Sequence, residues 1–161
     1  MRVRLAGTED LDVVCTMRVR FMAEHRGLRP DDFPPDFVPR TREFLERRAC
    51  AGTIRSWLAE HDGRPVGVVS MLLLDMAPMP DDPRSTDGYL INMYVDPVER
   101  CAGLGRQLLD ACVADATELG IHRLMLFTTG DGRPLYESAG FAADGDWLDV
   151  RLPRSPAPTM P

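Results

Sequence analysis

One continuous stretch, residues 89–120, limits the fold more than any other part of the chain. It begins with an apolar segment, YLINMYV (89–95), whose β-branched and aromatic residues are typical of a strand that ends at Pro97. A short turn with Gly103 and Gly105 follows, and an amphipathic helix then begins at once. The segment therefore predicts a strand and a crossover helix that packs its apolar stripe on a sheet.

Hydrophobic periodicity and turn residues predict the remaining elements. In chain order these are a strand at 2–5, a helix capped by Thr8 that runs to His25, a loop at 27–39, a helix at 40–49, strands at 54–61 and 65–74 joined by an Asp62-Gly63 turn, a loop at 75–88, the helix at 103–119, a strand at 123–128, a helix at 131–139 and a strand at 147–152. This order predicts a mixed sheet in a single α/β (α+β) domain at 1–152, followed by a Pro-rich, disordered tail at 153–161.

The turn before the crossover helix is suited to a phosphate. Glycines let a backbone approach a ligand closely, and the first N–H groups of a helix have no partner inside it. Arg100 and Arg106 add positive charge on either side of the turn, so a phosphate or pyrophosphate fits there. The alternative is a strand-to-helix turn softened by glycine, with no ligand.

The basic residues narrow the choice of phosphate ligand. All 19 are arginine, and the chain has no lysine. A P-loop needs a lysine, so it is excluded, as are lysine Schiff-base chemistry and a kinase-type phosphate clamp. A dinucleotide fingerprint needs a third glycine at the position of Leu108, so it is disfavoured as well.

The remaining composition argues against several partners. A net charge of −6 without a basic run disfavours nucleic acid. The four cysteines and three histidines show no metal-binding spacing, so we expect no metal and reduced thiols. No apolar stretch is long enough to span a membrane, and the first residues lack the apolar core of a signal peptide. We therefore expect a cytoplasmic protein with no membrane partner.

Two motifs resemble those of a known family. RCAGLG (100–105), preceded by NMYVDP (92–97), is similar to the acyl-CoA signature of the GNAT N-acetyltransferase superfamily, and GRPLYESAGF (132–141) is similar to its second signature. The order and separation of the two also match, and the resemblance extends over about residues 2–152. It implies the GNAT fold, in which a central mixed sheet with about four flanking helices splays between the strands at 89–95 and 123–128. Acetyl-CoA, the co-substrate, is expected in that splay.

The resemblance also implies roles for individual residues. Backbone N–H groups from Cys101 to Arg106 would hold the pyrophosphate, the strand at 93–95 would bind the pantetheine arm, and the Tyr136 hydroxyl would act as general acid toward the departing thiolate. Asn92 is expected to orient a water at the catalytic centre. The candidate cofactor-binding residues are Met93, Tyr94, Val95, Arg100, Cys101, Ala102, Gly103, Leu104, Gly105, Arg106, Thr129 and Arg133.

Two positions depart from the family pattern. Tyr89 stands where many members have a glutamate that serves as base, and Thr129 stands where an asparagine often contacts the pantetheine arm. By their place in or near acceptor-side segments, four other residues are candidates for the base: Asp75, Asp87, Glu24 and His25.

The expected activity is direct transfer of an acetyl group from acetyl-CoA to a primary amine of a small molecule or peptide. The aspartate-rich loops favour a cationic acceptor, and the resemblance is compatible with a homodimer. One alternative is an acyl-CoA sensor of the same fold without catalysis, which the two departures favour. A further alternative is an α/β protein that binds a nucleotide other than CoA.

Overall fold

The described residues of the computed structural model, 1–78, 80 and 86–143, contain one five-stranded sheet in the order β1-β2-β3-β4-β5. The predicted strand at 147–152 and the Pro-rich tail at 153–161 lie outside these residues. The strands are β1 (Arg2–Leu5), β2 (Ile54–His61), β3 (Arg64–Asp75), β4 (Thr86–Val95) and β5 (Leu124–Leu126). Neighbouring strands are antiparallel except β4 and β5, which are parallel, so the prediction of a mixed sheet is confirmed.

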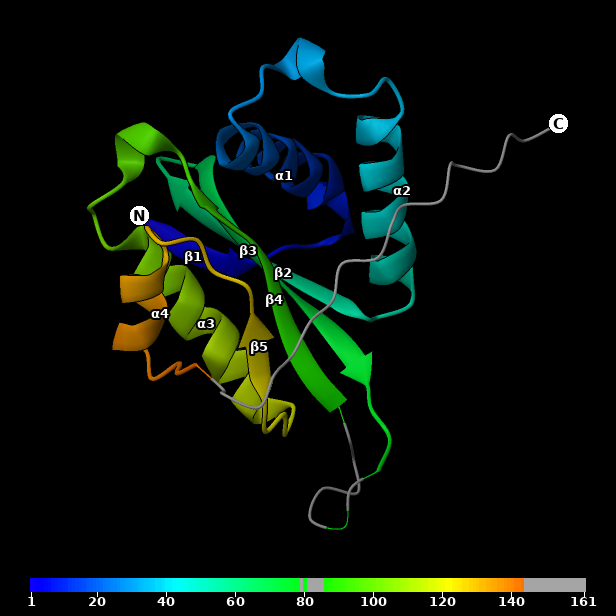
Figure 1. Cartoon of the computed structure of the whole chain (residues 1–161), viewed down its shortest axis with the longest axis vertical. Coiled ribbons are helices and arrows are strands. Elements are labelled where there is room, and N and C mark those ends of the chain that lie inside the picture. The colour runs from blue at the N-terminus through cyan, green and yellow to red at the C-terminus, as the bar shows by residue number, and fades with distance from the viewer. Residues whose placement is uncertain (79, 81–85, 144–161) are drawn as a thin grey trace, which may run out of the picture.

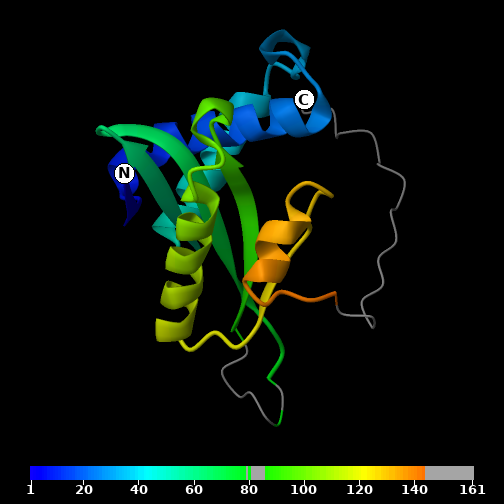
Figure 2. The same cartoon turned by 90° about the vertical axis from the view of Figure 1, so that its left-hand side faces the viewer.

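Four α-helices and three short 3-10 turns accompany the sheet in the described part of the chain. They are η1 (Thr8–Asp10), α1 (Leu11–Arg26), η2 (Pro30–Asp32), α2 (Phe37–Cys50), η3 (Pro97–Glu99), α3 (Leu104–Glu118) and α4 (Arg133–Ser138). Helices α1 and α2 cover one face of the sheet, while α3 and α4 cover the other (Figures 1 and 2). Helix α3 is the crossover that makes β4 and β5 parallel.

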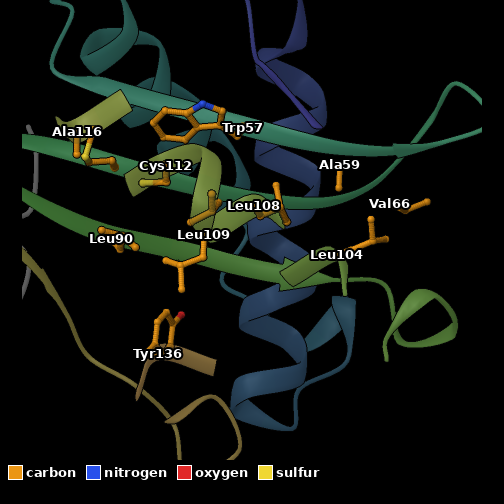
Figure 3. Packing of buried hydrophobic residues seen from close by; sticks show 12 residues of the cluster. Trp57, Ala59, Val66, Leu90, Leu104, Leu108, Leu109, Cys112, Ala116 and Tyr136 are labelled. Carbon is orange, nitrogen blue, oxygen red and sulfur yellow. The ribbon is translucent and has the colours of Figure 1, made fainter. Parts of the chain in front are cut away.

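Each face of the sheet has its own apolar core. The core under α3 contains Trp57, Val69, Leu90, Leu108 and Tyr136 among its buried residues (Figure 3). The core under α1 and α2 is smaller. It includes Val14, Cys15, Met17, Leu45, Leu58, Val68 and Tyr94. The sheet is therefore covered on both sides, which explains why β3 is a nearly continuous apolar run instead of an alternating one.

The Asp62-Gly63 turn between β2 and β3 is confirmed. Both residues have positive φ, 49° and 74°, as a two-residue hairpin requires. Three other boundaries differ from the prediction. Strand β4 begins at Thr86, helix α2 begins at Phe37, and β5 pairs only over Leu124–Leu126.

Thr8 was wrongly predicted to cap the first helix. It opens the 3-10 turn η1, and the residue that precedes α1 is Asp10. The Asp10 carboxylate accepts the N–H of Gly7 at 2.8 Å and pairs with Arg4 at 2.6 Å. This ion pair lowers the pKa of Asp10 and attaches the start of α1 to β1. A pairing with a residue on another element leaves no trace in local propensity, which is why the sequence suggested Thr8.

Leu108 offers a direct test of the core beneath α3, because its side chain is fully buried there. We expect Leu108→Ala to lower the free energy of unfolding by about 2–5 kcal/mol, through lost burial and the cavity left behind. Leu119 follows the same helix and is 45% exposed, so Leu119→Ala is the matched control and should cost far less. Chemical denaturation of both variants measures the difference. Equal losses would contradict this packing.

Candidate active site

A β-bulge in β4 shapes the site. Val68 pairs with Tyr94 and Ser70 pairs with Ile91, so Asn92 and Met93 together oppose the single residue between Val68 and Ser70. Asn92 adopts a left-handed φ of 61°, which asparagine tolerates better than most residues. The extra residue reverses the alternation of side chains along the strand.

The reversal is visible in the two cores. Leu90 packs in the core under α3, whereas Tyr94, four residues later, packs in the core under α1 and α2. In a regular strand, residues four apart share a face. The bulge therefore turns the last part of β4 to a new orientation.

The sheet opens beyond this point. Pairing between β4 and β5 extends only from Gly88 with Leu124 to Leu90 with Leu126. From Ile91 onward, the β4 edge that faces β5 has no strand partner among the described residues. Such an edge presents backbone N–H and C=O groups that an extended ligand can pair with.

At the end of β4 the chain reaches the start of α3. Gly103 precedes the helix with a left-handed φ of 79°, and no side chain caps the helix start. Within the described residues, the backbone N–H groups of residues 101–106 donate to no protein acceptor. Unpaired N–H groups at the positive end of a helix suit an anion, so the geometry is compatible with the phosphate predicted at this turn, which stays a prediction.

These features border one cleft of about 760 Å³. Its walls come from the second half of α1, the end of β4, the turn before α3, the start of α3 and the segment leading into α4. The predicted cofactor-binding residues that line it are Met93, Tyr94, Val95, Arg100, Cys101, Gly103, Leu104, Gly105, Arg106 and Thr129. Ala102 and Arg133 are not among the lining residues.

The three arginines among the predicted cofactor-binding residues are each paired with a carboxylate. Arg100 bonds Glu24 at 2.6 Å and also donates to the Val95 carbonyl at 2.9 Å. On the helices, Arg106 pairs with Asp110 at 2.7 Å and Arg133 pairs with Glu137 at 3.4 Å. In this arrangement the backbone N–H groups are the unpaired donors of the anion site, and an arginine would have to change partner to join them.

Tyr136 lies on α4 beside the cleft but does not line it. Its side chain is 8% exposed, its ring meets Phe141 edge-on at 5.8 Å, and its hydroxyl end turns toward α3 and the sheet (Figure 3). Burial, with a smaller effect from Cys112, raises the pKa of Tyr136 to about 12. The hydroxyl therefore stays protonated at physiological pH and can donate a hydrogen bond.

Asn92 lies behind the cleft, within the α1 face of the sheet. Its Oδ1 accepts a hydrogen bond from Arg18, and its Nδ2 donates to Ser70 Oγ at 3.3 Å. Ser70 Oγ in turn lies 2.7 Å from Ser56 Oγ. With a side chain only 2% exposed, Asn92 holds the bulge in place by these bonds.

The candidate bases separate into two groups. Glu24 and His25 line the cleft, and the His25 ring stacks on Phe21 at 5.7 Å. Asp75 and Asp87 lie at the far ends of β3 and β4 and do not line it. Tyr89, at the position of the family's glutamate, meets Phe127 edge-on at 6.3 Å.

Sequence reasoning missed part of the cleft wall. Phe21, Asp131, Gly132 and Leu135 line it, and Arg18 contacts the bulge. The signal for α1 was present. Arg18 stands within the apolar stripe of that helix, three residues before Phe21, where a charged residue needs a specific partner.

Metal-binding clusters and membrane-spanning helices are both absent from the described residues. No three His, Cys, Asp or Glu side chains gather there as they would around a metal ion. In the same part of the chain, no helix is long and apolar enough to cross a membrane.

The chain is similar to a known protein family and to solved structures. A model described as the acetyltransferase (GNAT) family matches residues 18–141. A predicted acetyltransferase from Clostridium acetobutylicum, solved with acetyl-CoA, is 25% identical with a TM-score of 0.82 over 93% of this chain and 95% of that one. A GCN5-related N-acetyltransferase from Ralstonia eutropha is 26% identical with a TM-score of 0.75 over 93% and 97% of the two chains. A search of curated proteins found no match.

The tyrosines give a pH-dependent prediction. Burial raises the pKa of Tyr89, Tyr94 and Tyr136, so in the folded protein each should hold its proton beyond pH 10, where a denatured tyrosine is about half ionised. Because the unfolded state then binds fewer protons, stability should fall as the pH rises above about 10. Absorbance titration of native and denatured protein measures tyrosinate directly. Coincident curves would contradict the burial.

Proposed function

Because the chain belongs to the GNAT acetyltransferase family, we propose that it transfers the acetyl group of acetyl-CoA directly to a primary amine of a small molecule or peptide. The observation that carries the proposal is the cleft that joins the unpaired N–H groups at the start of α3 to the open edge of β4. A ligand with a phosphate at one end and an extended amide chain fits both parts.

The residues present suit acetyl-CoA. The N–H groups of residues 101–106 would hold its pyrophosphate, and Gly103, with open space around its Cα, lets the phosphate come close. The β4 backbone at 93–95 would pair with the pantetheine arm. Support comes from the 25%-identical Clostridium protein, whose structure includes acetyl-CoA. When bound, acetyl-CoA supplies an acetyl group activated as a thioester.

In the proposed reaction, the amine nitrogen forms a bond to the acetyl carbon, the carbon–sulfur bond breaks, and one amine proton ends on the sulfur through solvent. By its place in the second family motif, the Tyr136 hydroxyl is proposed to stabilise the departing thiolate, which requires it to reach from the core under α3 to the cleft beside it. Its pKa of about 12 lies well above the ~8.5 of a thiol, so complete proton transfer would be uphill by about 5 kcal/mol. Tyr136 therefore acts chiefly as a hydrogen-bond donor.

The acceptor must also lose a proton before it attacks. An amine with a pKa of ~10 is about 0.1% neutral at pH 7, which costs on the order of 4 kcal/mol. Glu24 and His25, on the α1 wall of the cleft, are the proposed route for this proton through water. Asn92 is proposed to act through the shape of the bulge, since its amide is engaged by Arg18 and Ser70.

The preference of the site for a cationic acceptor is expected to be weaker than the aspartate-rich loop composition suggests. Asp32 pairs with Arg29 at 3.3 Å and Asp36 pairs with Arg40 at 2.7 Å, so part of the loop's negative charge is compensated. A cytoplasmic location and a homodimer remain part of the proposal.

A second candidate function is an acyl-CoA sensor without turnover, which the Tyr89 and Thr129 substitutions favour. Thiol release from acetyl-CoA against a panel of amines separates the two, because a sensor binds CoA and releases no thiol.

We expect Tyr136→Phe to lower kcat on the order of 100-fold by removing one hydrogen-bond donor at the departing sulfur, with CoA affinity nearly unchanged. Tyr89→Phe makes the same chemical change in β4, outside the cleft wall, and should leave turnover intact. Thiol-release kinetics and calorimetry measure the two quantities. Unchanged turnover in Tyr136→Phe, or equal loss of turnover and affinity, would remove its catalytic role.

We expect Gly103→Glu to abolish CoA binding, because it places bulk and negative charge where the pyrophosphate would lie. Gly52→Glu is the matched control, since Gly52 has a similar φ of 66°, open space for a side chain and a position after α2. Backbone strain and added charge are then equal in the two variants. Calorimetric titration with CoA gives the affinities, and retained affinity in Gly103→Glu would refute the phosphate site.

A further inference from the structure

Arg18 of α1 lies beside the bulge and has no counterion among the described residues. Its side chain is half-buried, and its hydrogen bond within the described residues runs from Nη1 to Asn92 Oδ1. No described carboxylate lies within ion-pair distance of it. A guanidinium has five N–H donors, so most of those on Arg18 remain unused.

Other arginines with partly buried side chains have acidic partners. Arg4 pairs with Asp10 and Glu60, and Arg55 bonds Asp115 through two nitrogens at 2.6 Å. Arg48 lacks one, but it lies over the Phe44 ring at 5.6 Å. Burying an uncompensated cation is costly, and burial lowers the pKa of Arg18. Its position therefore calls for a partner that the described residues do not supply.

Arg18 does not itself line the cleft, but residues close to it on α1 and at the bulge do. Phe21, which lines the cleft, follows Arg18 by three residues and so shares its helix face. Met93, which also lines the cleft, directly follows Asn92. In the described residues, Arg48 Nε is the one fully buried side-chain nitrogen or oxygen without a partner. The remaining nitrogens of Arg18 are therefore not both fully buried and unpartnered.

We propose that Arg18 binds a carboxylate of the acceptor, so that the substrate is an amino acid whose amine lies a few bonds from its carboxylate. The inference rests on the proposed function, which brings the reacting amine to the same bulge. A planar guanidinium suits a carboxylate because it can donate two parallel hydrogen bonds. Its positive charge also favours the neutral form of the neighbouring amine, which assists the attack in a chain with Tyr89 at the glutamate position.

The test compares matched pairs of acceptors by thiol release. Each of a set of amino acids is paired with the amine that lacks its carboxylate, such as phenylalanine with phenethylamine. We expect a preference of at least roughly tenfold in kcat/KM for the amino acid in the best pair. An equal or greater rate for the amine without the carboxylate would overturn the proposal.

Variants assign the preference to Arg18. Arg18→Gln should raise KM for the amino acid by roughly tenfold or more and leave its partner amine nearly unchanged, while Arg18→Lys restores part of the loss. Arg2→Gln, with the same loss of charge on the exposed side chain of β1, should change neither. An equal loss of both substrates in Arg18→Gln would indicate a structural or transition-state role and overturn the proposal.

A binding measurement separates this inference from the proposed function. N-acetylated amino acids and the N-acetylated amines without a carboxylate are compared, with CoA present, by their effect on Tm. If acetylated amino acids raise Tm and Arg18→Gln removes that effect, the carboxylate site is supported, even when no amine releases thiol. The absence of thiol release would refute only the proposed transferase activity. No stabilisation by any acetylated amino acid would overturn the inference, whatever the turnover.

Discussion

The site depends on one buried polar side chain, Asn92, whose hydrogen bonds hold the β4 bulge. Asn92 accepts from Arg18 on α1 and donates to Ser70 on β3, so a helix and two strands meet at one side chain. A left-handed asparagine in a strand is unfavourable by itself and persists because these bonds determine it. The bulge turns the end of β4, and the pairing of β4 with β5 stops just before it. The open edge and the cleft follow from that change of direction.

The anion site is built from the backbone, and the chain's charges are arranged around it. A protein with no lysine and a net charge of −6 still presents six consecutive N–H groups at the start of α3 that have no acceptor in the described part of the chain. The arginines nearby are paired, and Arg100 is held by Glu24, which also lines the cleft. A phosphate at this turn would therefore meet a fixed dipole first, and an arginine could join only by leaving its carboxylate.

Local chemistry made much of this predictable. The Asp62-Gly63 turn, the β2 boundaries and the start of α3 followed from residues that act within a few positions of themselves, and both family motifs lie on the expected elements. The exceptions are tertiary. Asp10, and not Thr8, precedes the first helix because it pairs with Arg4 on β1. The bulge at Asn92 depends on partners 22 and 74 residues away. Hydrophobic periodicity does not describe such contacts, so the pattern of α1 assigned Arg18 no role.

The two faces of the sheet supply different halves of the proposed chemistry. Tyr136 belongs to the core under α3 and would stabilise the sulfur, whereas Arg18 and Asn92 lie on the α1 face, where the acceptor would bind. The splay between β4 and β5 is the place where both faces reach one cleft. An amine that approaches from the α1 face can attack a thioester held from the α3 face without an acyl-enzyme step. Direct transfer is thus the reaction that this division of side chains favours, and it leaves the exposed Cys101 thiol without a required role.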